Sequence, residues 1–175
     1  MKNANLVSLT CCWLALAFTS GCGARESTLP APPKTVSEYF TIRVGDRAVR
    51  MQVAVLPMEM EHGLMGRRDL GPDDGMIFVY PEPQTMSFWM HNTPTPLDIG
   101  FFTPAGELEE IYPLLPFDER TVRSHDDHLQ FALEMNQNWY REHGLKPGAK
   151  LDLTALAAAL RARDLDPKKF GLEKN

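Results

Sequence analysis

Residues 75–102 read GMIFVYPEPQTMSFWMHNTPTPLDIGFF and form the densest apolar and aromatic stretch after the N-terminal segment. A polar segment, His91-Asn92-Thr93, interrupts the stretch between Trp89-Met90 and Leu97-Asp98-Ile99. Large apolar side chains at this density predict buried strands. We therefore expect the core and any binding site to be built from these residues.

Alternating apolar and polar residues on both sides of this stretch predict two hairpins. The first joins residues 38–44 to residues 47–56 through the turn Gly45-Asp46. The second joins residues 97–103 to residues 107–113. Further strands are expected at residues 76–80, 84–92 and 129–135.

Helical patterns are few and short. We expect one helix at residues 58–67, a second at residues 137–143 and a C-terminal helix at residues 154–163. Strands do not alternate with long helices, which excludes a parallel Rossmann-like sheet. The sequence therefore predicts a mainly β fold. We expect a compact antiparallel sandwich or partly closed barrel of about seven strands with two short helices, plus an added C-terminal helix.

Residues 1–21 have the layout of a secretory signal peptide. Lys2 precedes an apolar region, Leu6–Phe18, that is too short to span a bilayer comfortably. The following Ser20-Gly21-Cys22 resembles the bacterial lipoprotein signal, in which the chain is cut before the cysteine and the cysteine is lipidated. Acyl chains on Cys22 would hold the protein on a membrane.

Two residues near Cys22 bear on whether it is lipidated and on which membrane the protein reaches. Thr19 departs from the lipoprotein pattern, because an aliphatic residue is usual at that position. An uncleaved membrane anchor, or a cleaved signal that leaves Cys22 free, is therefore the alternative. Gly23, in place of an acidic residue, favours the outer membrane by resemblance to enterobacterial sorting. We expect an exported protein, anchored in the bacterial envelope and facing the periplasm.

Composition divides the rest of the chain. Residues 22–35 hold the lipidated cysteine and a Pro-rich tether, residues 36–153 a β domain, and residues 154–175 the C-terminal helix and a polar tail. No cysteine follows Cys22, which excludes a disulfide, a cysteine nucleophile and a cysteine metal ligand from the β domain. The formal net charge of −5 and the absence of a basic run disfavour nucleic acid as a partner.

Several motifs together resemble one known family. They are Gly63-Leu64-Met65 with Arg67 or Arg68, Gly75-Met76-Ile77-Phe78, Ser87-Phe88-Trp89-Met90, Asn92-Thr93, Pro96-Leu97-Asp98-Ile99, Phe131-Ala132-Leu133-Glu134 and Gly144-Leu145-Lys146-Pro147-Gly148. This combination is similar to the bacterial and archaeal domain of unknown function 192 family, over roughly residues 40–153. The resemblance implies a compact, mostly β fold that is often exported. It implies no activity, because none is established for the family.

The candidate binding residues lie mostly in the same motifs. They are Met65, Arg67, Arg68, Trp89, Met90, Asn92, Thr93, Asp98 and Glu134. Asp98 lies between two apolar residues, where a carboxylate without hydrogen-bond donors would be costly. It can line a polar pocket beside Trp89, or it can accept backbone N–H groups from the turn at residues 93–96 and fix that turn.

Three functions follow from these residues. The first is an envelope module that binds a small molecule, a glycan or an envelope protein through the surface around Trp89 and Asn92. The second is a hydrolase that uses Asp98 and Glu134 as an acid and base pair. The third is a structural envelope protein. We expect no enzyme activity, cofactor or metal, and we expect the loop His125-Asp126-Asp127-His128 to be solvated.

Overall fold

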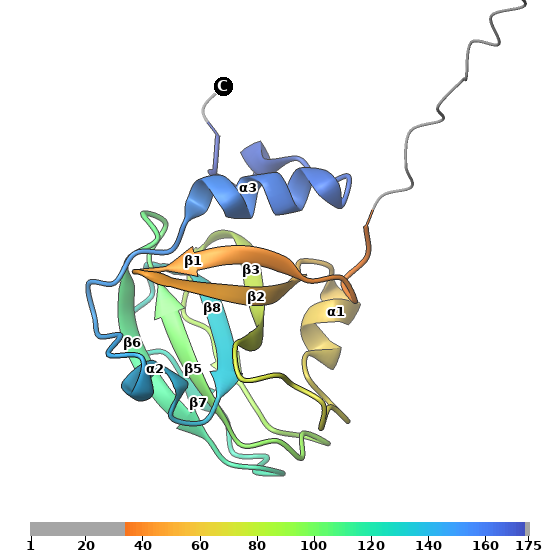
Figure 1. Ribbon diagram of the computed structural model, residues 1–175, viewed down its shortest axis with the longest axis vertical. Coiled ribbons are helices and arrows are strands. Elements are labelled where there is room, and N and C mark those ends of the chain that lie inside the picture. The colour runs from red at the N-terminus through yellow and green to blue at the C-terminus, as the bar shows by residue number, and fades with distance from the viewer. Residues whose placement is uncertain (1–33, 174–175) are drawn as a thin grey trace, which may run out of the picture. The chain divides into compact units, whose positions relative to one another are not determined.

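The computed structural model describes residues 34–173, so the expected signal peptide, the lipidation of Cys22 and most of the tether lie outside the described residues. Figure 1 shows a mainly β domain, as predicted, with few helices. The strands are β1 (Phe40–Val44), β2 (Arg47–Ala54), β3 (Asp74–Gln84), β4 (Ser87–Phe88), β5 (Leu97–Phe102), β6 (Leu108–Leu114), β7 (Val122–Arg123) and β8 (Leu129–Asn136). The helices are α1 (Pro57–His62), α2 (Trp139–Glu142) and α3 (Leu153–Ala162), with a 3₁₀ turn, η1 (Pro167–Phe170).

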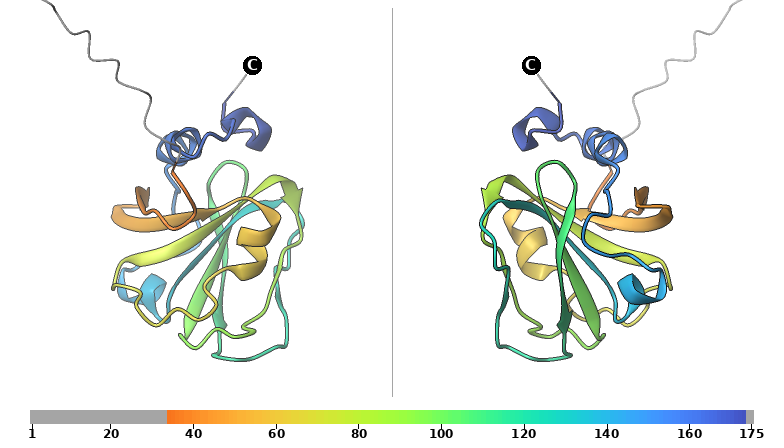
Figure 2. Two further views of the ribbon diagram at one scale, coloured as in Figure 1. Left: turned by 90° about the vertical axis from the view of Figure 1, so that its right-hand side faces the viewer. Right: turned by 90° about the vertical axis from the view of Figure 1, so that its left-hand side faces the viewer.

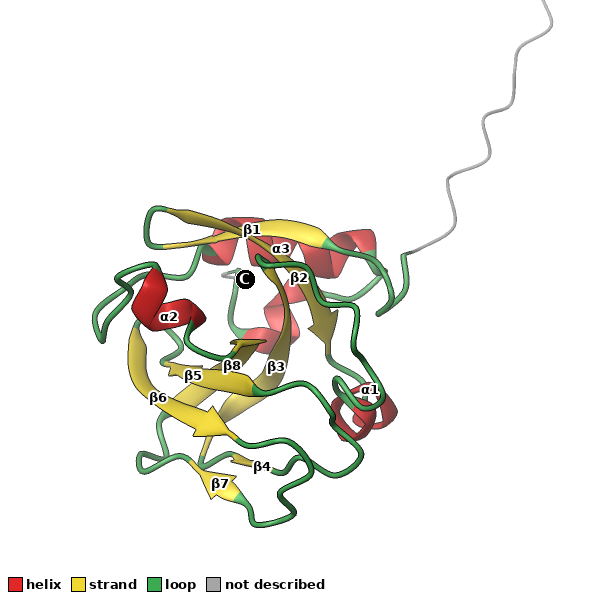
Figure 3. Cartoon of the chain, turned by 60° about the horizontal axis from the view of Figure 1, so that its bottom comes forward, coloured by secondary structure: helices red, strands yellow, loops and turns green. Residues whose placement is uncertain are grey.

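Six strands form one sheet in the order β1-β2-β3-β8-β5-β6, and β4 pairs with β7 in a second, two-stranded sheet (Figure 3). The sheet remains open between β1 and β6. A short segment around Lys150 and Leu151 bridges those two edges, because Gly45 N donates to Lys150 O and Leu151 N donates to Gly106 O. The result is a sandwich-like fold and not a closed barrel.

One pair of the large sheet departs from the expected antiparallel arrangement. β2 and β3 run parallel, with Met51 opposite Gly75. Both predicted hairpins formed, but α1 and the loop after it carry the chain back to the start of the sheet before β3 begins. A connection of this length allows a parallel return, whereas a two-residue turn does not.

The large sheet buries both of its faces. Ile42, Ile77, Leu133 and other residues of one face pack against Leu156 and Leu160 of α3. The opposite face holds a second cluster, which includes Phe78, Ile99, Ala132, Leu64 and Phe88. Figure 2 shows α3 beside β1 and β2, and α1 on a different side of the sheet. Consecutive residues of a strand point to opposite faces, so each strand contributes to both cores.

Two predicted strands have other lengths than expected. β3 continues through Pro81 and Pro83 to Gln84, because its register against β8 shifts between Val79 and Gln84 and no ladder N–H is needed there. Of the expected strand at residues 84–92, Gln84 belongs to β3 and only Ser87–Phe88 forms a separate strand, β4. Its predicted alternation nevertheless holds. Met86, Phe88 and Met90 are buried, whereas Ser87 and Trp89 are exposed.

The C-terminal segment packs on the first core cluster. Asp152 begins α3 by accepting a hydrogen bond from Ala155 N at 2.9 Å. After α3 the chain turns back through η1, where Phe170 is buried in the first core cluster. No helix within residues 34–173 is both long enough and apolar enough to cross a membrane.

Candidate functional site

Glu134 carries the least compensated carboxyl group of the described chain. It lies in β8, two residues before the strand ends, opposite Met76 of β3 and Ile99 of β5, and is 4% exposed. No hydrogen bond or ion pair joins its carboxyl to any residue within 34–173, and burial alone raises its pKa from 4.5 to about 8. A carboxyl left like this in an apolar core is rare and destabilising.

This carboxyl forms part of the wall of a cavity of about 300 Å³. Strands β3 and β4 contribute aromatic side chains, and α1 with the residues after it covers the other side. The lining residues are Met60, Glu61, His62, Gly63, Leu64, Met65, Phe78, Tyr80, Ser87, Phe88, Trp89, Thr93 and Glu134. The volume is at the lower end of the range for small-molecule sites, and the mostly apolar lining with a few polar groups is typical of them.

The orientation of Trp89 at the cavity rim is set by its neighbours. Its indole is stacked on the His91 imidazole, with ring centroids 4.9 Å apart and planes at 19°. The Nδ1 atom of His91 lies 2.7 Å from Oε1 of Glu119. Trp89 is still 45% exposed. An aromatic ring fixed in place but open to solvent is suited to contact a ligand.

The charge of Glu134 affects the pKa of Tyr80. Burial, followed by the negative charge of Glu134, raises the pKa of Tyr80 to about 12. The phenol therefore stays neutral at physiological pH and can donate or accept a hydrogen bond. Together, Tyr80 and Glu134 place two polar groups beside the rings of Phe78 and Phe88, which pack edge to face with centroids 4.9 Å apart.

The structure brings together four of the predicted site residues and separates the others. Met65, Trp89, Thr93 and Glu134 line the one cavity. Met90 is buried and faces a different hollow, beside Asp118 and Val122. The remaining predicted residues do not line this cavity. They are Arg67, Arg68, Asn92 and Asp98.

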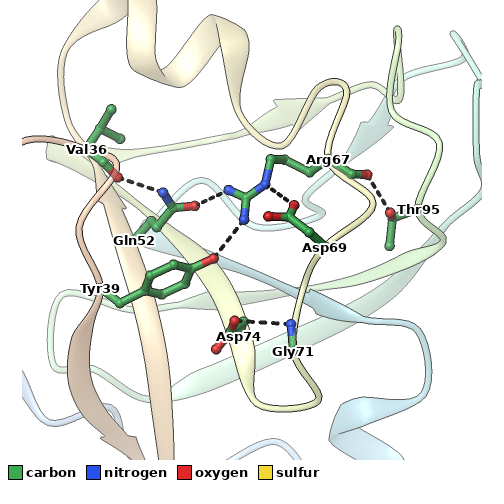
Figure 4. A network of polar contacts seen from close by, with 8 residues as sticks. All are labelled: Val36, Tyr39, Gln52, Arg67, Asp69, Gly71, Asp74 and Thr95. Carbon is green, nitrogen blue, oxygen red and sulfur yellow. Dashed lines mark hydrogen bonds and ion pairs between the residues drawn. The ribbon is translucent and has the colours of Figure 1, made fainter.

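Arg67 is held by a network of polar contacts (Figure 4). Its guanidinium donates to Gln52 Oε1 at 2.8 Å, to Tyr39 Oη at 2.9 Å and to Asp69 Oδ1 at 2.6 Å. Its backbone carbonyl accepts from Thr95 Oγ1 at 2.7 Å. Arg67 therefore ties the loop after α1 to β2 and to the turn before β5, while Arg68 is exposed.

Asn92 also has a structural task. Its φ of 51° lies in the left-handed region, which asparagine tolerates better than most residues. Its carbonyl accepts from Gly66 N at 2.8 Å, and Thr93 N closes the turn onto Met90 O at 3.1 Å. These bonds hold the turn against the loop that covers the cavity, so Asn92 supports the cavity without lining it.

Asp98 and Glu134 lie on opposite faces of the sheet, which rules out the predicted acid and base pair. In the register of β5 and β8, Asp98 is opposite Met135, whereas Glu134 is opposite Ile99. Burial raises the pKa of Asp98, opposed by the N–H of Asn138, which donates to Oδ2 at 2.7 Å. Asp98 thus fixes the start of α2. It does not fix the turn at residues 93–96, as the structural interpretation had expected.

His62, Phe78 and Tyr80 also line the cavity, and no motif in the sequence pointed to them as site residues. Phe78 and Tyr80 could have been found only with the pairing of β3 and β8, because they lie on the same face of β3 as Met76, the partner of Glu134. Within residues 34–173, no group of three or more His, Cys, Asp or Glu side chains is arranged to hold a metal ion.

Most of this domain is similar to known proteins. Residues 40–153 match the family described as DUF192, Uncharacterized ACR. A solved protein from Sinorhizobium meliloti 1021, described as a candidate transcription regulator, is 29% identical with a TM-score of 0.63, over 67% of this chain and 95% of its own. A protein of unknown function from Novosphingobium aromaticivorans DSM 12444 is 32% identical with a TM-score of 0.61, over 65% of this chain and 84% of its own. No curated protein matches the chain.

Proposed function

Because the chain belongs to the DUF192 family, which has no assigned activity, we propose from the site itself that the protein is a ligand-binding module of the bacterial cell envelope. The ligand is a small molecule that enters the cavity beside Trp89 and reaches Glu134. One observation carries this proposal: a buried carboxyl without a partner lines a cavity whose rim holds an exposed tryptophan. A ligand would supply the missing partner.

The envelope location rests on the N-terminal sequence. Ser20-Gly21-Cys22 after an apolar segment supports export and lipidation at Cys22, and Gly23 supports the outer membrane. A role in transcription, as in the description of the Sinorhizobium protein, is not proposed for this chain. A net charge of −5 opposes the counterion displacement on which nucleic-acid binding depends.

Binding at the cavity can be tested with a fragment collection that contains amines, sugars, carboxylates and neutral aromatics. We expect at least one class to bind to the purified full-length chain, and Trp89→Ala to weaken that binding about tenfold, the effect of losing one aromatic contact. Phe117→Ala is the matched control, because Phe117 is a comparably exposed aromatic residue, at 57%, that does not line the cavity. Protein-observed NMR would report binding.

Two results would contradict the proposal. In the first, no fragment of any class perturbs the cavity residues. In the second, the Trp89→Ala and Phe117→Ala variants bind the same fragments equally well, which would place binding elsewhere on the surface.

The membrane anchor is tested by Cys22→Ser. We expect this variant to lose its acyl chains and to leave the membrane fraction, because no other acylation site is proposed. Cys12→Ser should remain attached, since Cys12 lies inside the expected signal peptide. Mass spectrometry of the purified chain checks acylation, and fractionation checks attachment. An acylated Cys22→Ser variant would disprove the assignment.

A further inference from the structure

We propose that the ligand of this cavity carries a cationic nitrogen, an ammonium or guanidinium group on an apolar body, which pairs with the Glu134 carboxylate. This inference rests on the proposed function and narrows it to one chemical class. Three observations support it: the charges in the cavity lining, its aromatic side chains and the fixed position of Trp89.

The charged side chains around the cavity have one sign. Glu134 comes from β8 and Glu61 from α1, while no lysine or arginine lines the cavity. The other titratable groups that line it are His62 of α1 and Tyr80 of β3. Arg67 is not free to turn inward, because Gln52, Tyr39 and Asp69 already hold its guanidinium. No lysine or arginine is therefore available to pair with Glu134, and an anionic ligand would be repelled by the two glutamates when they are ionised.

The aromatic walls attract cations independently of the carboxylates. Phe78, Phe88, Tyr80 and Trp89 line the same cavity as Glu134. The face of an aromatic ring is electron-rich, and among side chains tryptophan binds cations best. His91 covers one side of the Trp89 indole and fixes its position, so ring contact with a ligand requires little loss of freedom. The apolar body of the ligand would pack on Leu64 and Met65.

A neutral ligand that accepts a hydrogen bond from protonated Glu134 is the competing class, and pH separates the two. Burial raises the pKa of Glu134 to about 8, so a cation must displace its proton at neutral pH. The affinity for a permanent cation should rise nearly tenfold per pH unit from pH 6 to pH 8 and then level off. The affinity for a neutral acceptor should be constant below pH 8 and fall above it.

The experiment compares benzylguanidinium with its neutral isostere benzylurea and with the anion 3-phenylpropanoate. The full-length chain is labelled with 5-fluorotryptophan, and Trp89→Phe assigns the fluorine resonance of Trp89. We expect benzylguanidinium to shift that resonance at a concentration at least tenfold lower than benzylurea at pH 8, and 3-phenylpropanoate to leave it unchanged. His62→Gln should preserve the pH profile, which separates His62 from Glu134.

Glu134→Gln should abolish both the preference for the cation and its pH profile. Asp98→Asn is the matched control, since Asp98 is also a buried carboxyl, but on the opposite face, and this variant should preserve both. The pH profile of the wild-type protein gives the same answer if a variant does not fold. Benzylurea or 3-phenylpropanoate binding as tightly as benzylguanidinium would overturn the cationic class and leave the cavity a binding site. Failure of all three compounds and of the whole fragment collection would overturn the proposed function as well.

Discussion

Glu134→Met should stabilise the protein at pH 7 by about 3 kcal/mol and lower its affinity for the proposed cationic ligand. Methionine has nearly the same length as glutamate but no group that needs a hydrogen-bond donor. The estimate follows from the pKa of Glu134, which is 4.5 in its ordinary state and about 8 in the fold. A core residue that destabilises its own fold is expected where function requires it.

The pH dependence of this gain has a defined sign. The folded-state pKa lies above the unfolded one, so between pH 4.5 and about pH 8 the folded chain retains a proton that the unfolded chain has released. Stability of the wild-type protein therefore falls as pH rises through this window. The advantage of Glu134→Met should be smallest near pH 4.5, grow to pH 8 and then remain constant.

Urea denaturation of the full-length chain at pH 5, 7 and 8 measures this difference. Glu134→Gln is the control, because it removes the titration but keeps a buried polar group. Its pH profile should match that of Glu134→Met, with a smaller gain. If Glu134→Met destabilises the protein equally at all three pH values, then Glu134 has a partner in solution, and the argument for a ligand fails.

Glu134 also shows how far the sequence determined the candidate site. Its place in the motif Phe131-Ala132-Leu133-Glu134 made it a candidate, as the other motifs did for Trp89, Met65 and Thr93. The pairing with Asp98 was wrong because a shift of one residue in the register of β5 and β8 decides which face each carboxyl occupies. The register depends on how the two strands pair, so it cannot be derived from the sequence of either strand alone.

The fold could also be predicted only where strand pairing has a local signal in the sequence. Alternation around Gly45-Asp46 identified β1 and β2, because the partner of each strand was its neighbour in the chain. The parallel pairing of β2 with β3 left no such local signal. Within η1 only Phe170 belongs to the core cluster, and one apolar residue beside two lysines gives no periodic signal that the segment packs on the core.

Arg163→Ala should destabilise the protein by about 3 kcal/mol or more, because it breaks a buried ion pair from one side. Arg163 follows α3 and is 8% exposed. Its guanidinium donates to the carbonyl of Val53 in β2 and to the carboxylate of Glu59 in α1. One side chain thus joins the C-terminal helix to the sheet and to the helix that covers the cavity.

The loss of Arg163 would leave the Glu59 carboxylate without its charged partner. This carboxylate also accepts from the backbone N–H groups of Val55 and Leu56, each at 3.0 Å. Burial raises the pKa of Glu59, but the hydrogen bonds from Arg163, Leu56 and Val55 together lower it below its ordinary value. The stabilisation from this pair is therefore present at neutral pH and is lost as pH falls through the folded-state pKa.

A double-mutant cycle with Arg163→Met and Glu59→Gln measures the coupling between the two residues. We expect the double variant to be more stable than the sum of the two single changes predicts, because removing both charges leaves neither of them buried alone. Lys34→Met with Glu38→Gln is the control cycle. That pair lies 3.5 Å apart on the surface and should contribute little. Simple additivity at Arg163 and Glu59 would show that the ion pair does not couple the end of α3 to α1 in solution.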